Sequence, residues 1–146
     1  MAVLVSRYNE LVTARLLEGA RECFRDNGVP EARVDVICVP GAFELPVAAE
    51  AAAASGRYAA LVALGCVVRG ETPHFEYVAG EATRGLGNVA LAHRLPVGFG
   101  VLTTDTLEQA LARAGGAAGN KGYEAVDAAL STADVLGQLT RAAPRD

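Results

Sequence analysis

Residues 59–74 have the sequence AALVALGCVVRGETPH, and this stretch decides the fold class. Its first ten residues are all small or apolar, and the next residue is Arg69. An apolar residue at every position predicts a strand covered on both faces, because a half-exposed strand alternates between apolar and polar side chains. Strands of this kind belong to parallel sheets that are packed with helices on both faces.

Three shorter runs rich in β-branched residues predict the other strands, at Val3 to Val5, Val34 to Val39 and Val97 to Leu102, beside the long one at Ala59 to Val68. Between and after the strands, apolar residues recur at helical spacing in four sets: Val12, Leu16, Ala20, Phe24; Phe75, Val78, Ala82, Val89; Leu107, Ala110, Leu111, Ala114; and Tyr123, Val126, Leu130, Ala133. Asp105 with Glu108, and Thr72 with Pro73, are typical of helix starts. The predicted order is βαβαβαβαα.

This order predicts a three-layer α/β/α sandwich around a four-stranded parallel sheet, because parallel strands need crossover helices and these cover both faces. In such sheets ligands bind outside the carboxyl ends of the strands. We therefore expect the functional residues just after each strand.

The composition limits the classes of function. The 146 residues suit one domain, spanning 1–146, and a net charge of −4 without a long run of either sign argues against a nucleic-acid partner. No apolar run reaches the roughly 18 to 20 residues of a membrane span, and no secretory signal precedes Val3, so we expect a soluble cytoplasmic protein. Cys23, Cys38 and Cys66 lack the paired spacing of a zinc site, and we expect all three to be buried in the core.

Four segments carry the candidate site residues: SRYN at 6–9, VPGAFELP at 39–46, VVRGETPH at 67–74 and GFGVLTT at 98–104. The third is the most informative. Gly70 allows the backbone to approach a ligand closely, and the start of the following helix favours an anion such as phosphate. His74, in the first turn, could exchange protons beside that anion near neutral pH. The alternative is that Thr72 only caps the helix and His74 is a surface residue.

Two further segments have open interpretations. Phe43 and Glu44 could stack on a flat heterocycle and accept its N–H groups, or Phe43 could be a core residue at a helix start. The sequence RAGGAAGNKG, from Arg113 to Gly122, forms a glycine-rich bend without the spacing of a Walker motif. Its two cations, Arg113 and Lys121, are either solvated or form a phosphate clamp. For His93 we prefer a simple role at a helix C-terminus.

Taken together, VPGAFELP, ALGCVVRGETPHFEYV, GVLTT and QALARAGGAAGNKGYEA resemble the lumazine synthase family in order and spacing. The resemblance runs from Val3 to about Ala133 and implies a flavodoxin-like sandwich. It implies an enzyme without metal or cofactor that condenses 5-amino-6-(ribitylamino)uracil with 3,4-dihydroxy-2-butanone 4-phosphate, giving 6,7-dimethyl-8-ribityllumazine, phosphate and water. It also implies a homopentamer or a 60-subunit shell, with riboflavin synthase as a suggested partner.

The resemblance assigns roles to residues by motif. His74 takes the place of the family's proton-transfer residue, and Lys121 adds charge near the phosphate. Glu71, Thr72 and Arg113 would hold the sugar phosphate. The pyrimidine and its ribityl chain would contact Tyr8, Ala42, Phe43, Glu44, Cys66, Val67, Val68 and Phe99.

Some features depart from the family pattern. Tyr8 stands where the family more often has phenylalanine or tryptophan, and the chain starts at its first strand, which leaves the quaternary state open.

Three other interpretations of the function are a riboflavin synthase of archaeal type, a flavin carrier of flavodoxin type and an inactive shell subunit. The carrier would need a hydroxyl-rich and glycine-rich loop after the first strand, where this chain has Ser6, Arg7, Tyr8 and Asn9.

Overall fold

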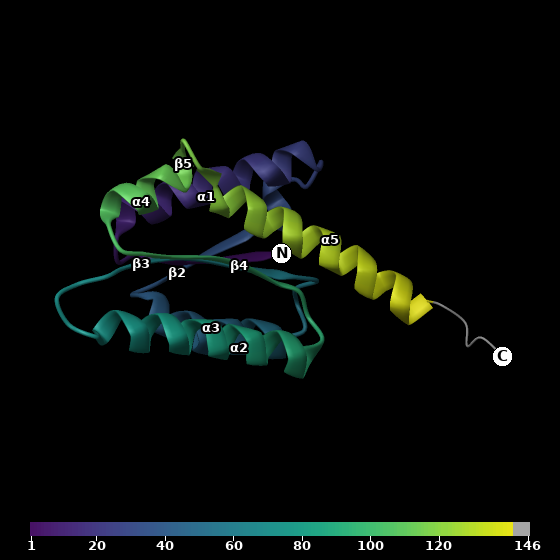
Figure 1. Cartoon of the computed structure of the whole chain (residues 1–146). Coiled ribbons are helices and arrows are strands. Elements are labelled where there is room, and N and C mark those ends of the chain that lie inside the picture. The colour runs from purple at the N-terminus through teal and green to yellow at the C-terminus, as the bar shows by residue number, and fades with distance from the viewer. Residues whose placement is uncertain (142–146) are drawn as a thin grey trace.

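A parallel sheet of four strands forms the centre of the computed structural model, which describes residues 1–141 (Figure 1). The strands are β1 (Ala2–Ser6), β2 (Asp35–Val39), β3 (Leu61–Val68) and β4 (Val97–Thr104), in the spatial order β2-β1-β3-β4. All four were predicted within two residues at each end, and the three-layer α/β/α class is confirmed.

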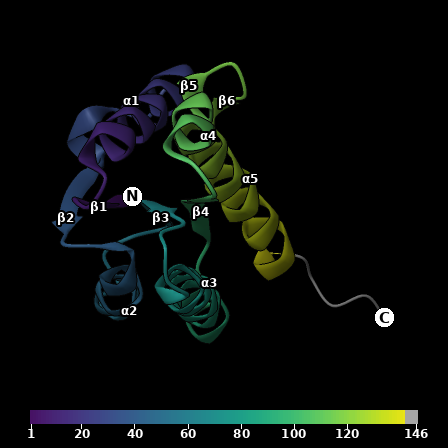
Figure 2. The ribbon, with the colours of Figure 1, turned by 60° about the vertical axis from the view of Figure 1, so that its left-hand side comes forward.

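The helices cover both faces of the sheet (Figure 2). On one face lie α1 (Glu10–Asp26), α4 (Leu107–Ala112) and α5 (Lys121–Arg141), and on the other lie α2 (Leu45–Ala54) and α3 (His74–His93). Short 3-10 turns, η1 (Glu31–Arg33) and η2 (Ala42–Glu44), flank β2. The glycine-rich bend before α5 contains a small antiparallel hairpin of β5 (Ala114–Gly116) and β6 (Gly119–Asn120), which the sequence analysis did not predict.

The core has two halves, one on each face of the sheet. Alternate residues of β1 enter opposite halves: Val3 packs with Leu16 and Val126 under α1 and α5, and Leu4 packs with Leu45 above α2 and α3. Every residue of β3 from Leu61 to Cys66 is buried. Burial on both faces explains why the sequence of β3 is apolar at every position.

β3 extends beyond its neighbour β1 at the carboxyl edge of the sheet. It pairs with β4 along its whole length, from Leu61 opposite Val97 to Val68 opposite Thr104, but its pairing with β1 ends at Leu64. The last residues of β3 therefore face loops on the β1 side rather than another strand.

Both predicted helix starts are wrong by one residue. Thr106, rather than Asp105, caps α4, through a capping box in which its hydroxyl accepts from the N–H of Gln109. Asp105 accepts a hydrogen bond from Arg69 instead. The third loop continues through Pro73, whose ψ of 4° departs from helical values, so α3 begins at His74 without a side-chain cap.

Two predictions about single residues also fail. Cys38 is exposed, while Cys23 and Cys66 are buried as predicted. Cys38 lies on β2, an edge strand that has a neighbour on one side only. Ala114 belongs to β5 because α4 ends at Ala112, two residues before the end of the predicted apolar stripe. No helix within residues 1–141 is long and apolar enough to cross a membrane.

Candidate active site

The loop after β1 runs beside the loop after β2. The backbone N–H of Arg7 donates to the carbonyl of Val39 at 2.9 Å, and that of Tyr8 donates to Pro40 at 3.0 Å. These bonds fix the backbone of Tyr8 next to the second loop, which contains Ala42 and Phe43.

Asn9 joins this loop to the end of β3. It adopts the left-handed conformation, with φ of 61° and ψ of 47°, and its Nδ2 donates to the carbonyl of Cys66 at 2.9 Å. Asparagine tolerates this conformation better than most residues with a side chain. The side-chain amide of Asn9 thus bonds to the edge of β3 that faces β1, at a point beyond the last residue of β3 that pairs with β1.

A pocket of about 220 Å³ opens at this junction. Its lining unites the end of β3 with residues that follow β1, β2 and β3: Tyr8, Ala42, Cys66, Val67, Val68, Gly70, Thr72, His74, Phe75 and Val78. Seven of these were predicted as site residues, and Gly70 had been singled out as the point of close approach. The first three loops therefore converge as the rule for parallel sheets requires.

Cys66 is a neutral thiol in the wall of this pocket. Burial raises the pKa of Cys66 to about 11. A thiol with such a pKa carries almost no thiolate at neutral pH, and the thiolate is the nucleophilic form. Cys66 therefore shapes the pocket and is unsuited to covalent catalysis.

His74 is the first residue of α3 and borders the pocket with its side chain exposed. The first N–H groups of a helix lack intrahelical partners, so this end of α3 favours an anion. Thr72 lines the same pocket, whereas Glu71 is exposed in the loop and does not line it. His74 does not pack in the core, so its substitution leaves the core intact.

Phe43 and Glu44 lie in η2, directly after Ala42. Phe43 is 59% exposed, which excludes the interpretation that it is a core residue. Neither residue lines the pocket of the single chain. The exposed ring is available to a flat ligand or to another protein surface.

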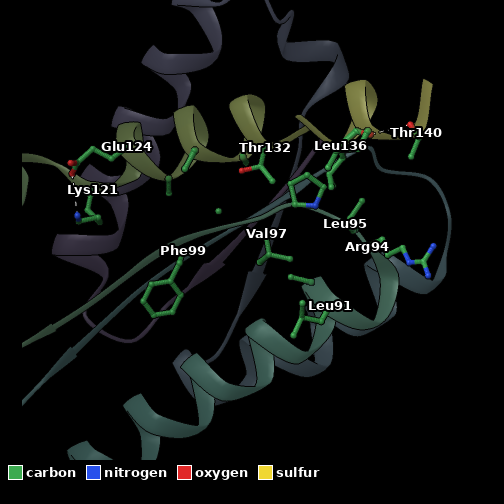
Figure 3. Close-up of a pocket in the computed structure, with 17 residues that line it drawn as sticks. Leu91, Arg94, Leu95, Val97, Phe99, Lys121, Glu124, Thr132, Leu136 and Thr140 are labelled. Carbon is green, nitrogen blue, oxygen red and sulfur yellow. Dashed lines mark hydrogen bonds and ion pairs between the residues drawn. The ribbon is translucent and has the colours of Figure 1, made fainter. Parts of the chain in front are cut away.

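Phe99 and Lys121 lie elsewhere, in an apolar groove of about 830 Å³ along the outer side of β4 (Figure 3). Phe99 projects from β4 and is 42% exposed, and Lys121 pairs with Glu124 at 3.3 Å at the start of α5. Leu91 and Leu136 border the groove from α3 and α5.

Arg113 lines neither the pocket nor the groove. It is exposed at the end of α4, and one guanidinium nitrogen donates to the carbonyl of Gln109 at 3.0 Å. Its own carbonyl accepts the backbone N–H of Lys121 at 2.8 Å, so the backbones of the two residues are joined across the base of the β5–β6 hairpin. Within one chain, seven of the predicted site residues thus line the pocket, Phe99 and Lys121 line the groove, and the other four line neither.

Two polar residues at the site received no role from the sequence analysis, namely Asn9 and Arg69. Asn9 was noted only as the end of SRYN, and Arg69 only as the residue after the apolar run. Arg69 donates to Asp105 at 2.8 Å and to Glu76 at 3.4 Å. The abrupt charge after ten apolar residues was the signal that could have singled out Arg69.

Within residues 1–141, no cluster of three or more His, Cys, Asp or Glu side chains has the arrangement of a metal site.

Comparison with known proteins decides the family. The family model described as 6,7-dimethyl-8-ribityllumazine synthase matches residues 1–137. The chain belongs to this family. All predicted site residues, from Tyr8 to Lys121, lie inside the matched region.

Individual members of the family are also similar over most of their length. The 6,7-dimethyl-8-ribityllumazine synthase of a Nitratiruptor species is 49% identical over 135 residues, which cover 92% of this chain and 88% of the relative. That of Nautilia profundicola is 53% identical over 126 residues, covering 86% of this chain and 82% of the relative. These matches favour lumazine synthase over the riboflavin synthase and flavin-carrier readings.

His93, the other histidine, ends α3 as expected. Its Nε2 lies 2.8 Å from Glu50 of α2, so it also links the two helices on that face. This pair lies at the end of α3 far from His74 and takes no part in the pocket.

Proposed function

We propose that the chain condenses 5-amino-6-(ribitylamino)uracil with 3,4-dihydroxy-2-butanone 4-phosphate to form 6,7-dimethyl-8-ribityllumazine in riboflavin biosynthesis. The observation that carries this proposal is the placement of His74 in a pocket bounded by Tyr8, Cys66 and Thr72. A proton-transfer group, an aromatic wall and an anion-favouring helix start then adjoin one another. The family assignment supplies the identity of the substrates.

The pyrimidine occupies the side of the pocket formed by the first two loops. The rings of Tyr8 and Phe43 offer faces for stacking, which suits a flat heterocycle. Glu44 accepts hydrogen bonds from the N–H or hydroxyl groups of this substrate. The end of β3, from Cys66 to Val68, forms the pocket floor beside the substrate.

The sugar phosphate occupies the side formed by the third loop. Gly70 and Thr72 border the pocket beside the first turn of α3, so a phosphate there meets backbone N–H groups and the positive end of the helix dipole. Arg113, which lies outside this pocket within one chain, adds a planar pair of donors from a neighbouring subunit, and such a pair matches two phosphate oxygens better than an ammonium does.

The reaction needs orientation and proton transfer. The 5-amino group of the pyrimidine attacks the ketone, and loss of water gives an imine. Elimination then releases phosphate, and ring closure through the ribityl-bearing nitrogen releases a second water. His74 is placed to move protons in these steps, and holding both reactants in one site removes much of the entropic barrier.

Direct assay tests the proposal. The purified protein should form a lumazine and inorganic phosphate in equal amounts when both substrates are present, and neither product when one is omitted. Product identification by mass separates this activity from that of a riboflavin synthase, which would form no product from these two substrates and would form riboflavin only when supplied with the lumazine. Absence of lumazine with an intact, folded protein would refute the proposed function.

We further propose that each complete site lies between two subunits of a cyclic homopentamer in the cytoplasm. The pocket of about 220 Å³ is smaller than the ~300–1,000 Å³ usual for a ligand site, and Phe99, Arg113 and Lys121 lie outside it. The exposed apolar surfaces are unlike one another, with Phe99 at the β4 edge and Ile37 at the β2 edge. A head-to-tail contact between unlike surfaces forms a ring when its rotation closes, and we propose a closed ring of five.

Co-assembly of inactive variants tests the shared site. His74→Ala and Arg113→Ala subunits should regain activity when mixed during refolding, because about one interface in four then receives both intact residues. His74→Ala mixed with Tyr8→Ala should stay inactive, since both residues border the same pocket. If the first mixture regains no activity although the oligomer mass proves that the two variants have co-assembled, the complete site lies within one chain. The same mass measurement distinguishes a pentamer from a 60-subunit shell, and co-purification tests riboflavin synthase as a partner.

A further inference from the structure

Arg69 directly follows β3 and begins the loop that leads to His74. Its backbone N–H donates to the carbonyl of Thr104, at the end of β4, at 2.8 Å. Its Nε donates to Oδ1 of Asp105 at 2.8 Å, so the guanidinium is also tied to the loop that follows β4. Backbone and side chain together fix Arg69 to the end of the neighbouring strand.

The other face and edge of the same guanidinium contact the first turn of α3. Its central carbon lies 4.6 Å from the centre of the Phe75 ring, which is a stacking contact between a cation and an aromatic face. One terminal nitrogen lies 3.4 Å from Oε1 of Glu76. Phe75 and Glu76 are the two residues that follow His74.

One side chain therefore connects both ends of the loop from Gly70 to Pro73. Gly70 has wide conformational freedom, and α3 begins without a side-chain cap, so the local sequence alone constrains the loop weakly. The Arg69 contacts supply the missing constraint.

We propose that Arg69 is a positioning residue that fixes His74, by joining the first turn of α3 to Asp105 in the loop that follows β4. This inference rests on the proposed function, because it assigns His74 the proton transfer. A displacement of about 1 Å in a catalytic group can lower turnover by about a hundredfold, so the fixation of the turn has a direct effect on rate.

The charge environment distinguishes this role from direct phosphate binding. The guanidinium of Arg69 is compensated by the carboxylates of Asp105 and Glu76. The guanidinium of Arg113 donates to a neutral carbonyl and keeps its charge available for an anion. Arg69 consequently acts through the loop and Arg113 acts on the phosphate.

Kinetics of substituted proteins test the proposal. Arg69→Met and Asp105→Asn should each lower kcat by about ten- to a hundredfold, with small changes in the two KM values. Arg69→Lys should recover part of the loss. Because both residues act through one contact, the double variant should be no slower than the slower single one. In a His74→Gln background, Arg69→Met should have almost no further effect.

Arg84 provides a matched control. It forms an ion pair with Glu81 on the exposed side of α3, and neither residue lines the pocket. Arg84→Met should leave kcat unchanged. Hydrogen exchange of the peptide 69–78 should accelerate several-fold in Arg69→Met and remain unchanged in Arg84→Met.

The outcomes separate the alternatives. A lower KM for the sugar phosphate in Asp105→Asn would mean that the freed guanidinium binds phosphate itself, and would overturn the positioning role. Unchanged kcat and unchanged exchange in Arg69→Met would also overturn it. If the unmodified protein forms no lumazine, the proposed function fails, and the exchange measurement still decides whether Arg69 fixes the turn.

Discussion

Substitution of Asn9 should separate the two ways in which this residue serves the site. Its backbone occupies the left-handed region at φ of 61°, and its amide holds the carbonyl of Cys66. Asn9→Gly keeps the backbone conformation without strain and removes the amide. Asn9→Ala removes the amide and also places a Cβ in an unfavourable conformation.

The expected losses of stability follow from these contacts. A hydrogen bond between an amide and a half-buried carbonyl contributes about 1 kcal/mol net, so Asn9→Gly should lower the free energy of unfolding by about that amount. The left-handed conformation costs a residue with a Cβ roughly 1–2 kcal/mol, so Asn9→Ala should be less stable than Asn9→Gly by at least about 1 kcal/mol.

The functional effect should be specific to one substrate. Without the amide, the loop that contains Tyr8 is no longer joined to β3, and the wall that stacks on the pyrimidine loses its fixed distance from the pocket floor. We expect a KM for the pyrimidine several-fold above that of the unmodified protein in Asn9→Gly, with little change in the KM for the sugar phosphate.

Urea unfolding and steady-state kinetics measure both effects. Asn27→Gly is the control, because Asn27 donates a similar bond to the carbonyl of Cys23 at 2.8 Å, at the opposite end of α1. It should lose comparable stability and keep its KM values. Equal pyrimidine KM values in Asn9→Gly and the unmodified protein would refute the reasoning, as would equal stabilities of Asn9→Gly and Asn9→Ala.

Three further substitutions test other parts of the site and fold. His74→Gln should lower kcat by ~10² to 10⁴ at an unchanged melting temperature, and an unchanged rate would remove His74 from proton transfer. Arg113→Lys should raise the KM for the sugar phosphate much more than that for the pyrimidine; equal effects would contradict the clamp. Gly98→Ala should lower the free energy of unfolding by about 1–3 kcal/mol, because its new methyl group would overlap the carbonyl oxygen of Ala125 in α5. A urea midpoint equal to that of the unmodified protein would contradict this overlap and show that α5 moves aside.

The sequence predicted those features that depend on period and on position after a strand. The apolar run before Arg69 predicted a buried central strand, and the structure places it there. Seven predicted site residues meet in one pocket because the carboxyl ends of parallel strands share an edge.

The failures depend on partners that are distant in sequence. Asp105 is an ordinary candidate for a helix cap, but Arg69, 36 positions away, provides its partner. Cys38 belongs to an apolar strand, yet strand order, which no local pattern contains, leaves that strand at an edge. The hairpin before α5 depends on Gly115 and Gly119 at positive φ, and a glycine-rich segment by itself is equally typical of an open bend.

The strand order also constrains when the protein can fold during its synthesis. The first residue of β1 pairs with Leu61, and β3 in turn pairs with a strand that ends at Thr104. Parallel pairing across such separations is slow compared with local contacts, because the intervening chain must first be closed into a loop. The sheet cannot be completed until more than two thirds of the 146 residues have left the ribosome, and before β3 emerges β1 lacks its partner on that side. Slowing translation between β2 and β3 should therefore lengthen the period in which the nascent chain aggregates or binds chaperones.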